Sequence, residues 1–240
     1  IIIALLVTSS LFVMAIPSQW MIDGVPYHRQ ETNYNCGDAS LQMVLSYYGR
    51  NITQKQIVDV ARTSKSVGTL SYDIARVAQF SILSQSQGTK WKNHESFEGF
   101  NGYPHGLNAV GYSSNEEWTD SLKTSIYLNI PVIVLMHYSV ESPGGHFRVV
   151  IGYNDDDETF TTLDPWDRDG QPQVFVIPYS NFTTLWNYTE VDSPRGTPFF
   201  GCAIWPLDIT LNVESSQGNQ TIFVGTVLYN NPIPGLSELS

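Results

Sequence analysis

Four residues of this 240-residue chain have the types and surroundings that nucleophilic acyl chemistry requires: Cys36, His146, Asp164 and Gln30. A thiol attacks a carbonyl carbon once a base has taken its proton, and a third group that orients the base makes it effective. A neutral amide can then donate to the oxyanion that forms. Together these residue types predict covalent catalysis on an amide or a related acyl group.

Cys36 stands where an extended segment turns into an expected helix. The run 39–48 is apolar at most positions, which is typical of a buried helix, and Gly49 can adopt the left-handed conformation that ends one. The free N–H groups and the dipole of a helix N-terminus favour the anionic, nucleophilic form of a thiol there. Gln30 lies six residues upstream, and a bend through 32–35 can bring its amide beside the sulfur.

His146 and Asp164 are expected on neighbouring strands. Residues 146–153 and 158–163 both have strand character, and the polar segment 154–157 between them reads as a hairpin turn. Pairing of these strands would bring His146 and Asp164 to the same open end of the sheet. The carboxylate can then accept a hydrogen bond from one ring nitrogen and leave the other for the thiol.

The chain has its helix signals before most of its strand signals. Capping boxes at 53–56 and 114–117 each open an expected helix, and another is expected from Ser71 to Phe80. Segment 85–113 has no sustained period and is expected to be a long functional loop. Strands are expected over 132–138, 146–153, 158–163, 173–177, 199–205, 207–213 and 221–229. Helices followed by antiparallel strands predict an α+β fold.

The composition narrows the classes of partner. With 12 basic and 23 acidic residues the net charge is −11, which argues against nucleic acid or an anionic membrane surface as a partner. The only cysteines are Cys36 and Cys202, so there is no disulfide framework, although pairing the two would abolish the nucleophile. No histidines have metal-ligand spacing, and 167–170 lacks the later Glu of a calcium loop. We therefore expect neither a metal nor a cofactor.

The first residues predict export. Residues 1–15 form an apolar run about as long as the core of a signal peptide, and they end in Val13-Met14-Ala15, with small residues where signal peptidase cuts. A secreted or extracellular protein is expected, and an uncleaved membrane anchor is the alternative. Export would also suit the four glycosylation tripeptides, which begin at Asn51, Asn181, Asn187 and Asn219.

Several motifs, in this order, resemble the papain-like cysteine peptidases and within them the C39-like peptidase family. They are Val25-Pro26-Tyr27 followed by Gln30, the Cys-Gly-x-Ala-Ser turn into Met-Val-Leu-Ser-Tyr-Tyr-Gly, Gly68-Thr69, Gly-Gly-His-Phe-Arg-Val-Val-Ile-Gly-Tyr, and Asp164-Pro165-Trp166. The resemblance covers about 25–205. It implies that Cys36 is the nucleophile, His146 the base, Asp164 its orienter and Gln30 the oxyanion-hole donor.

We therefore expect a papain-like fold in which N-terminal helices pack on a C-terminal antiparallel sheet. The expected organisation is a signal peptide or anchor over 1–15, a C39-like peptidase domain over 16–206 and a C-terminal β extension over 207–240. The expected function is that of an exported cysteine peptidase acting on a peptide or protein through a thioester. A non-catalytic binding module for peptide or cell-wall material, or an acyltransferase with the same triad, stays open. The best-known members of the family are fused to transporters and cut leader peptides after a double glycine, and that substrate does not carry over to this chain.

Overall fold

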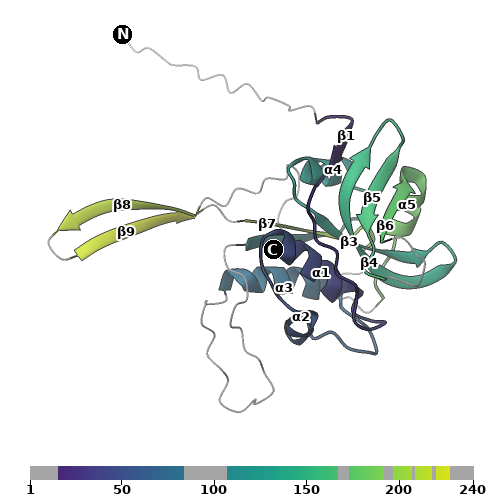
Figure 1. Ribbon diagram of the computed structural model, residues 1–240, viewed down its shortest axis with the longest axis horizontal. Coiled ribbons are helices and arrows are strands. Elements are labelled where there is room, and N and C mark those ends of the chain that lie inside the picture. The colour runs from purple at the N-terminus through teal and green to yellow at the C-terminus, as the bar shows by residue number, and fades with distance from the viewer. Residues whose placement is uncertain are drawn as a thin grey trace, which may run out of the picture.

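One large antiparallel sheet carries the fold. The computed structural model describes residues 16–83, 107–166, 173–191, 197–206, 209–217 and 220–227. The seven-stranded sheet has the order β2-β7-β3-β4-β5-β6, and β1 also pairs with β4 (Figure 1). Its strands are β1 (Gln19–Met21), β2 (Leu107–Tyr112), β3 (Val132–Ser139), β4 (Ser142–Asn154), β5 (Thr159–Leu163), β6 (Val174–Pro178) and β7 (Gly201–Pro206).

Three helices near the N-terminus form a group beside this sheet. They are α1 (Cys36–Tyr47), α2 (Gln54–Ala61) and α3 (Ser71–Leu83), and all three contact one another (Figure 1). Helix α1 packs on β4, while α3 packs on β2 and β7. The capping box at Thr53 and Gln56 is present as expected. None of the helices in the described part of the chain is long and apolar enough to cross a membrane.

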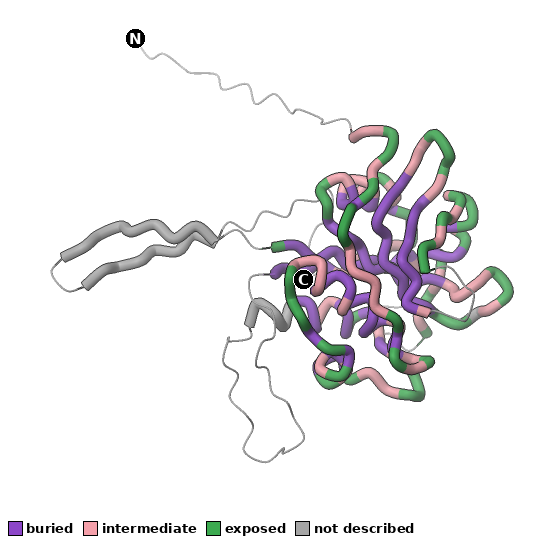
Figure 2. Tube along the Cα trace, viewed as in Figure 1, coloured by how far each residue is buried: buried purple, intermediate pink, exposed green. Residues whose placement is uncertain are grey.

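Two further helices, α4 (Thr119–Tyr127) and α5 (Tyr179–Trp186), complete the core. The indole of Trp118, just before α4, lies 4.9 Å from that of Trp186 on α5. Phe182 on α5 packs against Phe160 of β5 at 4.5 Å between ring centroids. Figure 2 shows buried residues along the central strands and through α1, so the element that begins with Cys36 is fixed by the core.

The mixed helix and antiparallel-sheet architecture confirms the predicted α+β fold class. The hairpin predicted at 154–157 is also confirmed, because β4 and β5 pair on either side of it. In this turn the Asn154 side chain accepts from the backbone N–H groups of Asp156 and Asp157.

The expectation of irregular structure from 85 to 113 is wrong at its C-terminal end. Residues 107–112 form β2, which pairs with β7 along its whole length. Neither strand predicts this pairing locally, because the partners lie 89 to 99 residues apart in the chain. The rest of that expected loop, up to residue 106, lies outside the described residues.

Three other local expectations need correction. The Ser114 hydroxyl accepts from the Glu116 N–H in a turn, and α4 begins only at Thr119, without a side-chain cap. Helix α5 was not expected, although Phe182, Leu185 and Trp186 follow helical spacing. Strand β4 starts at Ser142, four residues before the expected start, because Ser142 and Gly145 pair with β3. His146 therefore lies within the strand.

A β-bulge in β4 changes its pairing with β5. Gly152 pairs with Thr161 whereas Val150 pairs with Thr162, so Ile151 is an extra residue. A shift of one residue reverses which faces of two strands meet. From Thr162 onward, each β5 residue therefore pairs with a β4 residue one position away from the one that the turn alone would predict. The side chain of that partner points to the other face of the sheet.

The expected signal segment, 1–15, lies outside the described residues. Within 207–240, strands β8 (Ile209–Gln217) and β9 (Gln220–Val227) pair with each other in a separate two-stranded sheet.

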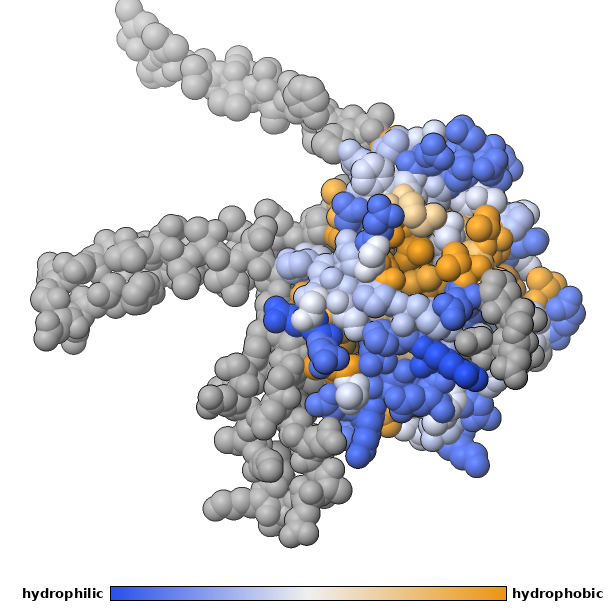
Figure 3. Space-filling view, viewed as in Figure 1, coloured by the Kyte–Doolittle hydropathy of each residue, from blue (hydrophilic) through white to orange (hydrophobic). Residues whose placement is uncertain are grey.

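On the surface, a hydrophobic area lies over the strands in Figure 3, and the exposed Met21 and Val176 line one shallow pocket.

The close packing of Trp118 on the sheet gives a test of the fold. A Cβ added at Gly201 would lie 2.6 Å from the Trp118 ring, whereas one added at Gly144 would meet nothing nearer than 3.9 Å. We expect Gly201→Ala to lower the free energy of unfolding by about 1–3 kcal/mol, because overpacked cores must rearrange. Gly144→Ala, the matched control, should stay within about 0.5 kcal/mol of wild type. Urea denaturation measures both, and equal stability of the two variants would contradict the packing described.

Candidate active site

Cys36 is the first residue of α1 and is half-buried. Asn35 is the N-cap residue but makes no side-chain cap, because its Oδ1 instead accepts from the Thr32 hydroxyl at 2.8 Å. The first turn of α1, which begins with Cys36, thus has no side-chain cap from Asn35. Both cysteines are free thiols, and burial raises the pKa of Cys202 to about 12. Cys36 and Cys202 are therefore not joined in a disulfide, which was the alternative that the sequence left open.

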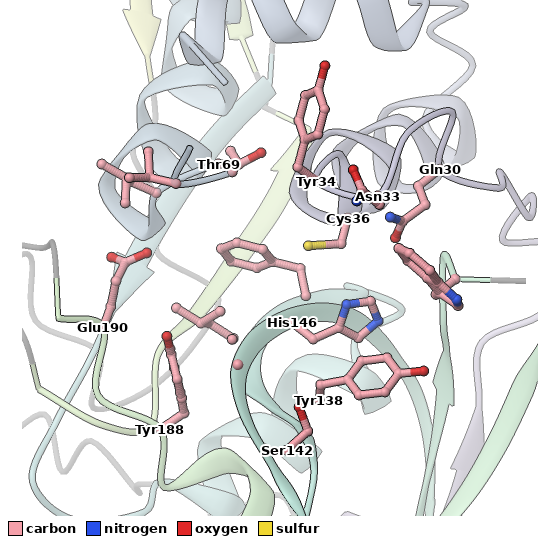
Figure 4. A pocket seen from close by; sticks show the side chains of 18 of the residues that line it. Gln30, Asn33, Tyr34, Cys36, Thr69, Tyr138, Ser142, His146, Tyr188 and Glu190 are labelled. Atoms are coloured by element: carbon pink, nitrogen blue, oxygen red, sulfur yellow. The ribbon is translucent and has the colours of Figure 1, made fainter. Parts of the chain in front are cut away.

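The predicted partners Cys36, His146 and Asp164 are brought together. His146 Nε2 and Asp164 Oδ1 are 2.7 Å apart, and the Cys36 side chain, on the same cleft, is close enough to help raise the pKa of His146. Because Nε2 is engaged by the carboxylate, Nδ1 is the nitrogen left for the sulfur. Figure 4 shows the Cys36 side chain and the His146 ring on the same cleft.

Burial and hydrogen bonding have opposite effects on this pair. Burial by itself lowers the pKa of His146, but the hydrogen bonds to Asp164 and Cys36 outweigh it and raise that pKa. Burial tends to raise the pKa of Asp164, yet the His146 hydrogen bond and the nearby positive charges lower it. The geometry thus favours an imidazolium that is held between a carboxylate and a sulfur.

Gln30 lies on the same cleft, at the bend before α1. Its backbone N–H donates to Pro165 O at 2.9 Å, and its Nε2 donates to Thr32 O at 2.5 Å. An amide nitrogen carries two N–H groups, so one donor remains for the cleft. Figure 4 shows the Gln30 amide beside Cys36, with the His146 ring below both residues in this view.

Gln54 holds this segment in place, a role that no local pattern in the sequence indicates. Gln54, the first residue of α2, is buried; its Nε2 donates to Arg29 O at 2.7 Å and its Oε1 accepts from Glu31 N at 3.0 Å. One amide side chain therefore brackets Gln30 on both sides through the backbone. The pattern resembles a short β-bridge made by a side chain.

The cleft has a volume of about 590 Å³ and contains Cys36, His146 and Gln30 in its lining. Tyr138 and Trp166 also line it, and the Tyr138 ring lies edge-on to His146 at 5.2 Å between centroids. A cleft of this size admits an extended peptide segment. Within the described ranges, no three His, Cys, Asp or Glu side chains gather as a metal site would require.

Asp38, two residues after Cys36, is a second buried carboxylate that sequence reasoning missed. It accepts from the Thr63 hydroxyl at 2.8 Å and from the Thr69 hydroxyl at 3.3 Å. Thr69 lines the cleft and packs against Gly37, where an added Cβ would lie 2.7 Å away. Asp38 therefore fastens the wall of the cleft to the first turn of α1. Burial raises its pKa to about 7, and the two threonine bonds offset this only partly.

The fold is that of the papain-like cysteine peptidases. Xylellain, a cysteine protease from Xylella fastidiosa, superposes with a TM-score of 0.53 at 12% identity, over 81% of this chain and 88% of that one. Two further solved structures have lower scores. A double glycine motif protease from an AMS/PCAT transporter, in complex with the leader peptide, has a TM-score of 0.47 and 21% identity over 78% of this chain and 98% of that one. The peptidase domain of Streptococcus ComA, a bifunctional ABC transporter in a quorum sensing pathway, has a TM-score of 0.48 and 19% identity over 76% of this chain and 97% of that one.

The sequence itself assigns the family. Residues 22–193 match the Peptidase_C39 like family, and the chain belongs to it. The matched range contains all four predicted site residues and every strand of the large sheet except β1 and β7. No curated protein sequence matches the chain.

The burial of Asp38 has a measurable cost. A carboxyl whose folded pKa is about 7 instead of 3.8 keeps its proton in the folded state while the unfolded chain has lost it. Asp38 thus destabilises the fold increasingly as pH rises from about 4 to 7, by up to roughly 4 kcal/mol. We expect Asp38→Asn to lack this loss. The free energy of unfolding of this variant should therefore rise relative to that of wild type as pH increases from about 4 to 7.

Denaturant unfolding at pH 4 to 8 measures this difference. Asp59→Asn, at an exposed position, is the control and should follow the wild-type profile throughout. A wild-type minus Asp38→Asn difference that does not change with pH would contradict the buried, protonated carboxyl.

Proposed function

We propose that the chain is an exported cysteine peptidase that cleaves a peptide or protein through a thioester. Cys36 is the nucleophile, His146 the general acid and base, Asp164 the residue that orients His146, and Gln30 a donor to the oxyanion. The observation that carries the proposal is the buried His146 ring, which is hydrogen-bonded to Asp164 and shares a peptide-sized cleft with Cys36.

In the first half of the reaction the Cys36 thiolate adds to the carbonyl carbon of the scissile amide. The developing oxyanion receives hydrogen bonds from Gln30 Nε2 and the Cys36 backbone N–H. The His146 imidazolium then gives its proton to the departing amine, and the C–N bond breaks. The acyl group remains on the sulfur as a thioester.

In the second half, neutral His146 takes a proton from water as the water oxygen adds to the thioester carbon. The C–S bond breaks, the carboxylic acid product leaves, and the thiolate–imidazolium pair is restored. Asp164 keeps Nε2 engaged throughout, so that Nδ1 serves both proton transfers. An acceptor other than water would make the same site an acyltransferase.

Export is part of the proposal and rests on the sequence. It is supported by the apolar 1–15 run with its small residues at 13 and 15. The glycosylation tripeptides support it as well, since Asn51, Asn181 and Asn187 are exposed and thus accessible to modification.

Replacement of the two cysteines tests the nucleophile. Cys36→Ser should lose at least about 10³-fold in turnover while the fold persists, because the swap is nearly isosteric but removes the reactive sulfur. Cys202→Ala should keep near wild-type turnover, since Cys202 is a buried thiol on β7. Hydrolysis of a mixed library of peptidyl aminomethylcoumarin substrates measures both. A wild-type protein that binds such peptides without cleaving them would establish the binding module instead.

A second substitution separates the oxyanion donor from the nucleophile. Gln30→Ala should reduce hydrolysis by about 10²–10³-fold, because one donor to the oxyanion is lost. Alkylation of Cys36 by iodoacetamide develops no oxyanion, so its rate should stay close to wild type. His146→Ala, measured in parallel, should lose both reactions. If alkylation of Gln30→Ala fell in step with hydrolysis, Gln30 would be holding the site together and not serving the oxyanion.

A further inference from the structure

A buried arginine that the reaction scheme does not use lies behind the His146–Asp164 pair. The Arg148 side chain is only 7% exposed, and its Nε donates to Asp164 Oδ2 at 2.8 Å. Its Nη1 donates to His137 O at 3.2 Å and its Nη2 to Tyr138 O at 2.9 Å. Three donors of one planar group thus reach two separate segments of the chain.

The register of the sheet explains why Arg148 meets Asp164. Beyond the bulge Val149 pairs with Leu163, and continuing by one residue places Asp164 opposite Arg148. Residues opposite each other share a face, and so do residues two apart on one strand. The bulge therefore brings Arg148, His146 and Asp164 to one face. Without it, Asp164 would lie opposite Val149 on the other face.

Arg148 fixes both groups that hold the His146 ring. The Asp164 carboxylate gives Oδ1 to His146 Nε2 and Oδ2 to Arg148, so the guanidinium prevents the carboxylate from rotating. The Tyr138 carbonyl that Arg148 binds belongs to the residue whose ring packs edge-on against His146. The pairing of β3 with β4 is irregular between His137 and Ser139, and Arg148 binds the carbonyls of His137 and Tyr138 at this irregularity.

The charge of Arg148 also balances the reactive state. When the thiolate and imidazolium have formed, Cys36 and Asp164 carry two negative charges and His146 and Arg148 two positive ones. Removing the guanidinium leaves a net negative charge in a buried site, which favours a proton on the imidazole. Arg148 thus keeps His146 able to give up its proton.

We propose that Arg148 is a positioning residue of this site, which orients the Asp164 carboxylate and the Tyr138 backbone on two sides of His146 and balances the charge of Asp164. The proposal rests on the proposed function, because it concerns the same triad. Arg148 contributes two things to the site: a planar set of donors that fixes its partners, and a positive charge. A lysine at this position keeps the charge but loses the planar set of donors.

The test compares Arg148→Met and Arg148→Lys by two measurements. The His146 pKa is followed by NMR titration of ¹⁵N-histidine-labelled protein, with the resonance assigned by its loss in His146→Ala. The turnover number is measured with the peptidyl aminomethylcoumarin library. In Arg148→Met we expect the His146 pKa to rise by roughly one pH unit and turnover to fall by about 10–100-fold. In Arg148→Lys the pKa should stay near wild type, while turnover still falls.

Lys123→Met is the matched control. It removes another partly buried cation, paired with Asp155 at 2.6 Å beyond the far end of β4, and should leave the His146 pKa unchanged. An unchanged or lowered His146 pKa in Arg148→Met would overturn the charge balance, and full turnover in Arg148→Lys would overturn the positioning. If Arg148→Met does not fold, Arg148→Lys alone decides the positioning, and a lysine variant whose His146 pKa rises overturns the charge balance. The NMR titration does not depend on turnover, so failure of the proposed function is read separately from failure of this inference.

Discussion

The structure depends most on one buried carboxylate, Asp164, which two cationic side chains must satisfy at once. An unpaired carboxylate in the core would be protonated or would open the fold. His146 on one oxygen and Arg148 on the other remove that penalty, and both come from β4. The strand, its bulge and the hairpin that returns to Asp164 are therefore under a single electrostatic requirement. The same requirement leaves the second nitrogen of His146 directed at Cys36.

The opposite side of the cleft is held by hydrogen bonds of the uncharged Gln54 side chain and by Asp38, a carboxyl group whose burial destabilises the fold. Gln54 brackets the backbone around Gln30, and Asp38 ties Thr69 to the turn that carries the thiol. Gln54 acts at little electrostatic cost, whereas burial makes Asp38 hard to ionise. The fold thus accepts a destabilising group two residues from the proposed nucleophile, a pattern that is common where position matters more than stability.

Local signals in the sequence predicted the parts of the site that depend on local structure. The apolar run after Cys36 defined its helix, and the turn at 154–157 brought His146 and Asp164 to neighbouring strands. Gln30 was reached through spacing and family resemblance. Arg148 was missed because its role depends on a bulge at Ile151, and the sequence between Val149 and Tyr153 contains no sign of it except Gly152. Strand β2 and the contacts of Asp38 and Gln54 depend on pairings between distant segments, which no local pattern encodes.

The hydrogen bond from Gln30 N to Pro165 O joins the two sides of the cleft by their main chains. It connects the residue before the helical layer to the residue that follows Asp164 in the sheet layer. A displacement of one layer against the other would have to stretch or break this bond before Gln30 and Asp164 could move apart. One main-chain bond therefore sets the spacing between the segment that carries Gln30 and the segment that carries Asp164.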